Sequence, residues 1–316
     1  MGWNVTATRE LAPPPVEPAA APEQSRARYP DETGFVEREG VRVFWERYGS
    51  GPRTVLLMPT YSILYSRRWR AQIPFLARHW QVVTFDGRGN GRSDRPTEVA
   101  AYADTEFVAD AIAVMDTTGV ERAVVVGLSM GGGWALRLAA EHPDRVEAAV
   151  FEGASVPIAD PLPHPLVYPG MEKYEDAYRR SNHHGFVEFF FEERLTEPHS
   201  TKQIEDGVGW GLETDAETLL RASNAPYLAP VIGDPDLSEK HLVARALAAR
   251  VRCPSLVIHG GDDHVVAIRH AEYLARELGA SYVRLEGSGH LPANRDPVRF
   301  NLLLRDFIRS LPAAGR

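Results

Sequence analysis

The chain has 316 residues, of which 44% are hydrophobic and 25% charged, as is ordinary for a globular protein, and its formal net charge at pH 7 is −8. This acidic balance argues against nucleic acid and anionic membranes as partners, because both require a basic binding face. A lone cysteine, Cys253, excludes an internal disulfide and argues against a metal site, and no apolar run reaches the roughly 18 residues needed to span a membrane.

The first 30 residues are rich in Pro, Ala and Glu and include Pro13-Pro14-Pro15. This composition predicts a disordered or loosely docked arm over residues 1–30, and an arm that reaches a partner subunit is the alternative. Because the segment lacks the apolar core of a secretory signal, we expect a cytoplasmic protein.

Alternating apolar and polar residues from 35 to 46 predict a hairpin that turns at Glu39-Gly40. Helical patterns recur further along, with a break predicted at Pro74, and they occupy residues 67–79, 107–118, 267–278 and 297–311. Short apolar runs typical of buried parallel strands lie between them, at 54–58, 81–85, 123–126, 147–151, 255–260 and 281–286. This alternation predicts an α/β fold with a mostly parallel sheet and helices on both faces.

One serine stands between an apolar run and a helix of small residues, in Gly127-Leu128-Ser129-Met130-Gly131. Such a strand, turn and helix force the serine into a strained conformation that only small neighbours tolerate. The hydroxyl is then presented at a helix N-terminus, where the dipole favours developing negative charge. The motif predicts Ser129 as a nucleophile, and a glycine-rich turn that only reverses the chain is the alternative.

Residues 153–251 break the alternation, since a connection between a strand and the next helix needs far fewer residues. We expect an inserted cap here, between the two parts of a core at 31–152 and 252–316. An aromatic cap predicts a mostly apolar pocket, although most of the rings can instead form the cap's own small core. Its aromatic residues include Tyr174, Tyr178, Phe186, Phe189, Phe190, Phe191, Trp210 and Tyr227.

A serine hydroxyl needs a base, and the base needs a carboxylate that orients it. The strand at 255–260 ends in a loop with Asp262 and Asp263, and the strand at 281–286 leads to Gly287-Ser288-Gly289-His290. Both loops lie at the carboxyl end of a strand, which is the edge where open α/β sheets place their sites. We therefore predict His290 as the base and Asp263 as the acid, with Asp262 as the alternative acid.

Together these motifs resemble the α/β-hydrolase superfamily over roughly residues 34–311. The resemblance is carried by the serine turn, by His259-Gly260-Gly261-Asp262-Asp263, by Gly287-Ser288-Gly289-His290, and by Phe85-Asp86-Gly87-Arg88-Gly89-Asn90-Gly91-Arg92-Ser93-Asp94. It implies the α/β-hydrolase fold with a helical cap inserted after strand 6. It also implies the roles of Ser129 as nucleophile, Asp263 as acid and His290 as base, because the family's acid stands three residues after the loop glycine, here Gly260.

The chain departs from this family where His-Gly usually follows the third strand, because Pro59-Thr60 stands there. The oxyanion hole uses backbone N–H groups, so the family alignment implies the amides of Tyr61 and Met130 as its donors. The side chain of Tyr61 either contacts substrate or packs against the cap. Further candidates for substrate binding are Thr60, Ser62, Trp134, Phe190 and Trp210.

The predicted function is hydrolysis of a carboxylic ester, or a related acyl bond, of a small to medium hydrophobic substrate. Alternatives on the same three residues are carbon–carbon bond hydrolysis, acyl transfer and cofactor-free haloperoxidase-type chemistry. A ligand-sensing module with the hydrolase fold is the alternative from another class. We expect no cofactor or metal, a small molecule as the partner, and a monomer or homodimer.

Overall fold

The computed structural model describes residues 28–159, 170–227 and 237–313. Nearly all of the predicted N-terminal arm lies outside these residues. Among the helices that the structure describes, none combines the length and apolar character needed to cross a bilayer.

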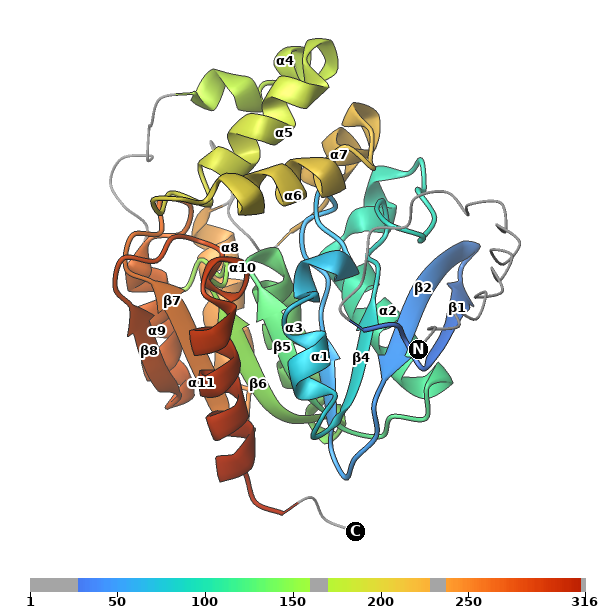
Figure 1. The fold of residues 1–316 in the computed structure, drawn as a ribbon, viewed down its shortest axis with the longest axis vertical. Helices are drawn as coiled ribbons and strands as arrows, with labels where there is room; N and C mark the ends of the chain where they lie inside the picture. The colour runs from blue at the N-terminus through green and yellow to red at the C-terminus, as the bar shows by residue number, and fades with distance from the viewer. Residues whose placement is uncertain (1–27, 160–169, 228–236, 314–316) are drawn as a thin grey trace, which may run out of the picture.

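An eight-stranded sheet forms the centre of the molecule, in the order β1-β2-β4-β3-β5-β6-β7-β8 (Figure 1). Strand β2 pairs antiparallel with β1 and β4, and all other neighbours are parallel. The strands are β1 (Glu32–Arg38), β2 (Val41–Tyr48), β3 (Thr54–Leu57), β4 (Gln81–Phe85), β5 (Ala123–Leu128), β6 (Val146–Glu152), β7 (Ser255–Gly260) and β8 (Ser281–Leu285). The predicted fold class is thus confirmed.

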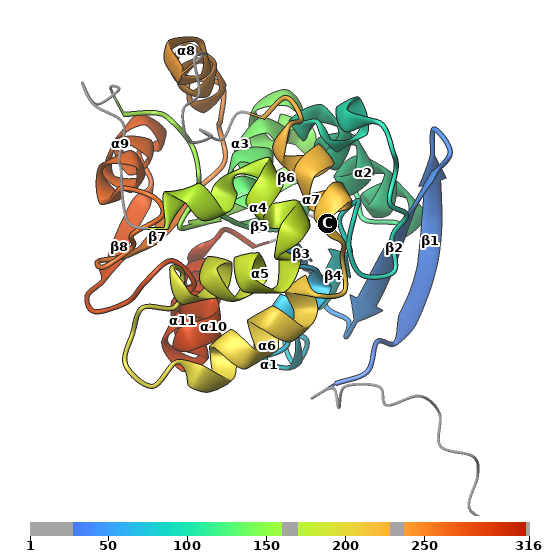
Figure 2. The same cartoon turned by 90° about the horizontal axis from the view of Figure 1, so that it is seen from above.

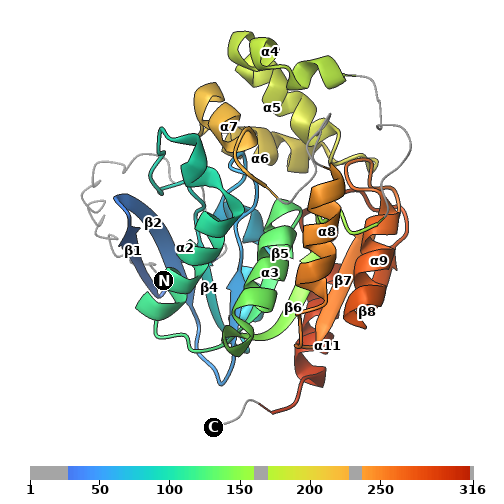
Figure 3. The same cartoon turned by 180° about the vertical axis from the view of Figure 1, so that it is seen from behind.

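Helices cover both faces of the sheet (Figures 1 and 3). One face carries α2 (Asp104–Thr117), α3 (Met130–Glu141), α8 (Leu237–Ala248) and α9 (Ile268–Leu278), and the other carries α1 (Ile73–Leu76) and α11 (Pro297–Ser310). Short helices η1 (Ser66–Trp69), η2 (Val99–Tyr102), η3 (Pro143–Arg145) and α10 (Pro292–Arg295) complete the connections. A hydrophobic core lies on each face of the sheet, and strand β5 is buried between them. Its residues alternate, since Val125 packs on one face and Val124 and Val126 pack on the other.

Local sequence signals explain several of these elements. The predicted hairpin is confirmed, and its turn places both Glu39 and Gly40 at positive φ, as a two-residue hairpin turn requires. The predicted break at Pro74 is also confirmed, because η1 ends at Trp69 and Pro74 lies in the first turn of α1. Asp296 caps α11 by accepting the N–H of Arg299.

Four further helices lie above the carboxyl ends of the strands, and we call them the cap helices (Figures 1 and 2). They are α4 (Asp176–Ser181), α5 (His183–Glu192), α6 (Thr201–Gly211) and α7 (Ala216–Ser223), preceded by η4 (Met171–Tyr174). An apolar layer joins them to the core, in which Phe190 and Trp210 cluster with Leu128 and Leu291. Helix α8 falls within the segment that we expected to form the cap, but it packs beside α3 and α9 on the sheet face (Figure 3).

Candidate active site

Ser129 occupies the strained turn that its motif predicts. Its φ of 52° and ψ of −119° lie outside the regions that L-residues ordinarily adopt. A side chain on Gly127 would overlap the carbonyl oxygen of Gly131, and one on Gly131 would overlap that of Pro59. The two glycines therefore let strand β5, helix α3 and the Pro59 loop meet around the serine.

Three backbone hydrogen bonds hold this turn in place. The N–H of Ser129 donates to the carbonyl oxygen of Glu152 at 2.9 Å, and the Ser129 carbonyl accepts the N–H groups of Gly132 and Ser155 at the same distance. Ser129 is half-buried and caps the N-terminus of α3, so the unpaired N–H groups of the first helical turn favour negative charge beside it.

His290 pairs with Asp263 in a buried hydrogen bond, with 2.8 Å between Nδ1 and Oδ2. The other carboxylate oxygen of Asp263 accepts the N–H groups of Val265 and Val266 at 2.8 and 2.9 Å. Burial acts to raise the pKa of Asp263, but His290 and the surrounding donors outweigh it and lower that pKa. Asp262 is exposed. The structure therefore places Asp263 against the histidine.

Ser129 and His290 lie against the same strand end. Glu152, the last residue of β6, accepts the N–H of Ser129. The next residue, Gly153, contacts the imidazole, because a Cβ built on it would lie 3.2 Å from Nδ1 of His290. The carboxyl end of β6 thus brings the serine and the His290–Asp263 pair together, although Ser129 and His290 are far apart in the sequence.

His259 is a buried member of this group that the sequence analysis left without a role. Its Nε2 lies 2.9 Å from the carbonyl oxygen of Val266 and 3.3 Å from Oδ2 of Asp263. Because both neighbours accept hydrogen bonds, Nε2 carries the proton. Burial lowers the pKa of His259 and keeps the ring neutral. Its place near the end of strand β7, four residues before Asp263, was the only sequence signal for it.

Glu152 connects the serine turn to the segment that follows His290. Its carboxylate lies 3.1 Å from the guanidinium of Arg68 and accepts the N–H of Ala293 at 2.8 Å. Both side chains of the ion pair are buried, with exposed fractions of 1% for Arg68 and 0% for Glu152. No local sequence pattern pointed to this pair.

The loop at Pro59-Thr60 lies against the serine turn, and Tyr61 extends from it toward the cap helices. The Tyr61 hydroxyl donates to the carbonyl oxygen of Leu219 at 3.0 Å and lies 2.7 Å from the hydroxyl of Ser223. Arg179 donates to the same Tyr61 oxygen at 2.6 Å. In the described part of the chain, no backbone hydrogen bond engages the N–H of Tyr61 or of Met130.

The remaining substrate-binding candidates fall into three groups. Ser62 and Trp134 use their polar atoms inside the protein, since Ser62 donates to the Arg88 carbonyl at 2.8 Å and the Trp134 indole donates to Asp104 at 2.6 Å. Thr60 is buried, and its hydroxyl has no partner among the described residues. Phe190 and Trp210 belong to the apolar layer between the cap helices and the core.

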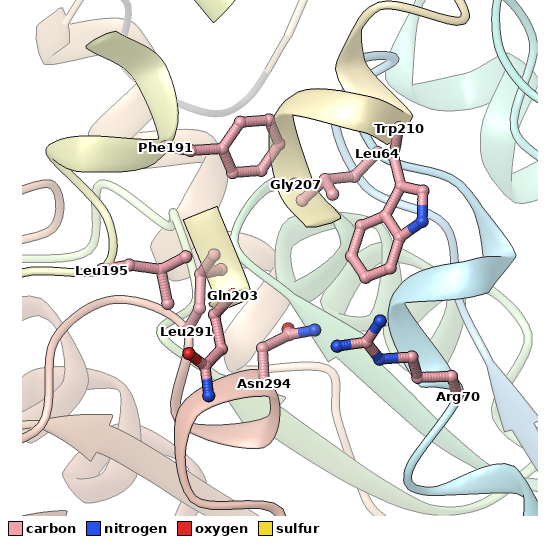
Figure 4. A pocket seen from close by; sticks show the side chains of 9 residues that line it. All are labelled: Leu64, Arg70, Phe191, Leu195, Gln203, Gly207, Trp210, Leu291 and Asn294. Carbon is pink, nitrogen blue, oxygen red and sulfur yellow. The ribbon is translucent and has the colours of Figure 1, made fainter. Parts of the chain in front are cut away.

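A hollow of about 260 Å³, counting space open to solvent, lies at this layer (Figure 4). Trp210 and Phe191 come from the cap helices, while Leu291 is the residue next to His290. The other lining residues are Leu64, Arg70, Leu195, Gln203, Gly207 and Asn294. Within the described ranges, no cluster of three or more His, Cys, Asp or Glu residues could hold a metal ion.

Comparison with known proteins agrees with this fold. A family model for the alpha/beta hydrolase fold matches residues 58–293. The chain is 29% identical to 2-hydroxymuconate semialdehyde hydrolase of Pseudomonas sp. (strain CF600), over 85% of this chain and 87% of that protein. It is 41% identical to a protein named as carbamate hydrolase RutD of Caulobacter segnis, over 76% and 85% of the two chains.

A pimeloyl-(acyl-carrier protein) methyl ester esterase of Neisseria meningitidis is 29% identical over 76% of this chain and 87% of its own. Among solved structures, a bromoperoxidase from Bacillus anthracis has a TM-score of 0.74 at 21% identity, over 88% of this chain and all of that one. At that identity the likeness shows the fold alone. The family match and the full-length relatives, together with the sheet and the serine turn, establish that the chain belongs to the α/β-hydrolase family.

Proposed function

We propose that this protein is a serine hydrolase that cleaves a carboxylic ester, or a related acyl bond, of a small to medium hydrophobic substrate. The observation that carries the proposal is the buried His290–Asp263 pair, which lies at the same strand end as the strained Ser129. Relatives named as hydrolases, one of them an esterase, support hydrolysis as the reaction class.

In the proposed mechanism, Ser129 attacks the acyl carbonyl while His290 accepts its proton. Asp263 holds the imidazole in the tautomer that has a free Nε2 and stabilises the imidazolium that forms. The N–H groups of Tyr61 and Met130 bind the oxyanion. His290 then protonates the leaving group and activates a water molecule that releases the acid from Ser129.

The preference for a hydrophobic substrate follows from the apolar layer beside the site, to which Phe190 and Trp210 contribute. Carbon–carbon bond hydrolysis is the second candidate function. It is favoured by the likeness to 2-hydroxymuconate semialdehyde hydrolase over most of both chains. The same serine, histidine and aspartate would act on a ketone carbonyl in that reaction.

A substrate panel tests the proposal. Turnover of aryl esters with short, medium and long acyl chains, and of a β-diketone, is measured for the wild type and for Ser129→Ala. We expect ester turnover that peaks at short or medium acyl chains and is lost in the variant. Turnover of the β-diketone alone would favour the second candidate function. A wild type no faster than Ser129→Ala on every substrate would contradict both.

A further inference from the structure

The segment between α5 and α6 holds the loop that carries His290. The N–H of His290 donates to the carbonyl oxygen of Arg194 at 3.2 Å. The N–H of Gly289 donates to Oε1 of Glu197 at 2.7 Å, and the hydroxyl of Ser288 donates to the same oxygen at 3.3 Å. Three successive residues of the histidine loop are therefore each bonded to this one segment, which descends from α5 beside the loop leading to α10 (Figure 1).

The contact between the two segments is close. A Cβ built on Gly289 would lie 3.0 Å from the Thr196 hydroxyl and 3.1 Å from the Arg194 carbonyl oxygen, so a glycine permits this approach. The second oxygen of Glu197, Oε2, is buried and has no hydrogen-bond partner among the described residues. Among the described residues, both hydrogen bonds of this carboxylate thus come from the histidine loop. A hydrogen bond to an ionised acceptor is stronger than one to a neutral carbonyl.

The core and the cap segment hold different parts of His290. Asp263 from the β7 loop binds the imidazole, whereas Arg194 and Glu197 bind the backbone that carries it. On the core side, the Ser288 carbonyl also accepts the N–H of Asp262 at 2.9 Å. The position of the imidazole therefore depends on both sides, because the cap segment binds the backbone of Gly289 and His290 while the core binds the ring and the backbone at Ser288.

We propose that Glu197 is a positioning residue for His290, which reaches its working position only while the 194–197 segment is docked against the histidine loop. This inference rests on the proposed function, in which His290 is the base. The 194–197 segment joins α5 and α6, which carry Phe190 and Trp210. A substrate that packs against these helices would therefore also affect the position of His290.

Labelling by a fluorophosphonate measures the proposal directly, because its rate depends on how well His290 activates Ser129. We expect Glu197→Ala to slow labelling about tenfold to hundredfold, the effect of a small misplacement of a catalytic group. Glu197→Gln keeps an oxygen that can accept the Gly289 N–H, so its rate should stay within about threefold of the wild type. The kcat for a substrate should fall in parallel in Glu197→Ala, with KM nearly unchanged.

Glu213→Ala is the matched control. Glu213 is another glutamate beside the cap helices, and it accepts a hydrogen bond from the Tyr65 hydroxyl at 2.7 Å. In the described part of the chain, no hydrogen bond joins Glu213 to residues 288–290. Its removal should leave labelling unchanged. Gly289→Ala, which retains Glu197 but forces the two segments apart, should slow labelling as Glu197→Ala does. Equal slowing in Glu197→Ala and Glu213→Ala, or wild-type labelling in Glu197→Ala, would overturn the proposal.

Hydrogen exchange at the amides of Gly289 and His290 gives a readout that needs no activity. We expect these two amides to exchange at least tenfold faster in Glu197→Ala and at the wild-type rate in Glu213→Ala. Thermal unfolding curves would show that both variants are folded. If the wild type fails to label at all, the proposed function fails, and exchange still decides the role of Glu197. Unchanged exchange in Glu197→Ala would then overturn the positioning role by itself.

Discussion

At the scale of single residues, the side chain of Asp263 is fully buried and its carboxylate holds the imidazole of His290. Asp263→Asn should reduce kcat by about 10³ to 10⁴, because an asparagine can hold the imidazole in the wrong tautomer, as in the serine-protease triad from which this magnitude is taken. KM should change little, and steady-state kinetics on the best ester would measure both.

Asp262→Asn is the neighbouring control, since Asp262 is exposed and should be dispensable. If Asp262→Asn lost activity while Asp263→Asn retained it, the assignment of the acid would be contradicted. The family resemblance already favoured Asp263. The structure adds its hydrogen bond with His290 and the bonds that Val265 and Val266 donate to its second oxygen.

His270 gives the fold a predictable response to acid. Burial, with help from Arg269, His259 and His241, lowers the pKa of His270 to about 4. As the pH falls, His270 therefore takes up a proton near pH 6.5 in the unfolded chain but only near pH 4 in the folded protein. The free energy of unfolding consequently falls as the pH is lowered from 6.5 to 4. The stability that the neutral His270 ring contributes is fully present above pH 6.5.

We predict that His270→Asn makes the free energy of unfolding less sensitive to acid between pH 6.5 and 4. The asparagine oxygen can still accept the N–H of Ala159, which now donates to Nδ1 at 3.3 Å. Between these pH values the wild type should lose about 2 kcal/mol more than the variant in urea unfolding. Parallel pH profiles would show that His270 does not titrate in this way. Asp86, whose pKa burial raises to about 6, acts in the opposite direction and is common to both proteins.

At the scale of elements, the buried Arg68–Glu152 pair joins η1, β6 and α10 beneath the site. Burial lowers the pKa of Arg68, while Glu152 opposes this shift. We predict that Arg68→Met destabilises the protein by about 3–5 kcal/mol, because it leaves a buried carboxylate without a counter-charge. Urea unfolding measures the loss.

The double variant Arg68→Met/Glu152→Gln should recover a large part of that loss, since the glutamine is neutral and its oxygen can still accept the Ala293 N–H. A double variant less stable than Arg68→Met alone would mean that the uncompensated charge is not the cause. Both variants lack the packing of the arginine side chain, so the difference between their free energies of unfolding reports the effect of the buried charge.

Elements with strong local signals could be predicted from the sequence. The Glu39-Gly40 turn, the break at Pro74 and the cap at Asp296 each depend on neighbouring residues alone. The place of α8 could not be predicted in this way. It lies in the long segment after β6, and only its packing against α3 and α9 shows that the chain has returned to the sheet before β7.

At the scale of the whole molecule, the sheet order and the meeting of the serine, aspartate and histidine loops at one edge follow from parallel strands, whose carboxyl ends lie together. This is why Ser129, Asp263 and His290 could be proposed from motifs at strand ends. Glu152 and Glu197 could not be proposed in this way, because each contacts a segment remote in the sequence, and such contacts leave no local pattern.

The central claim is that Ser129 is a nucleophile activated by His290. Its most direct test is treatment of the protein with a fluorophosphonate, followed by peptide mass spectrometry. We predict a single adduct on Ser129 that disappears in His290→Ala. An unlabelled wild type, an adduct on another residue, or equal labelling of His290→Ala would contradict the account.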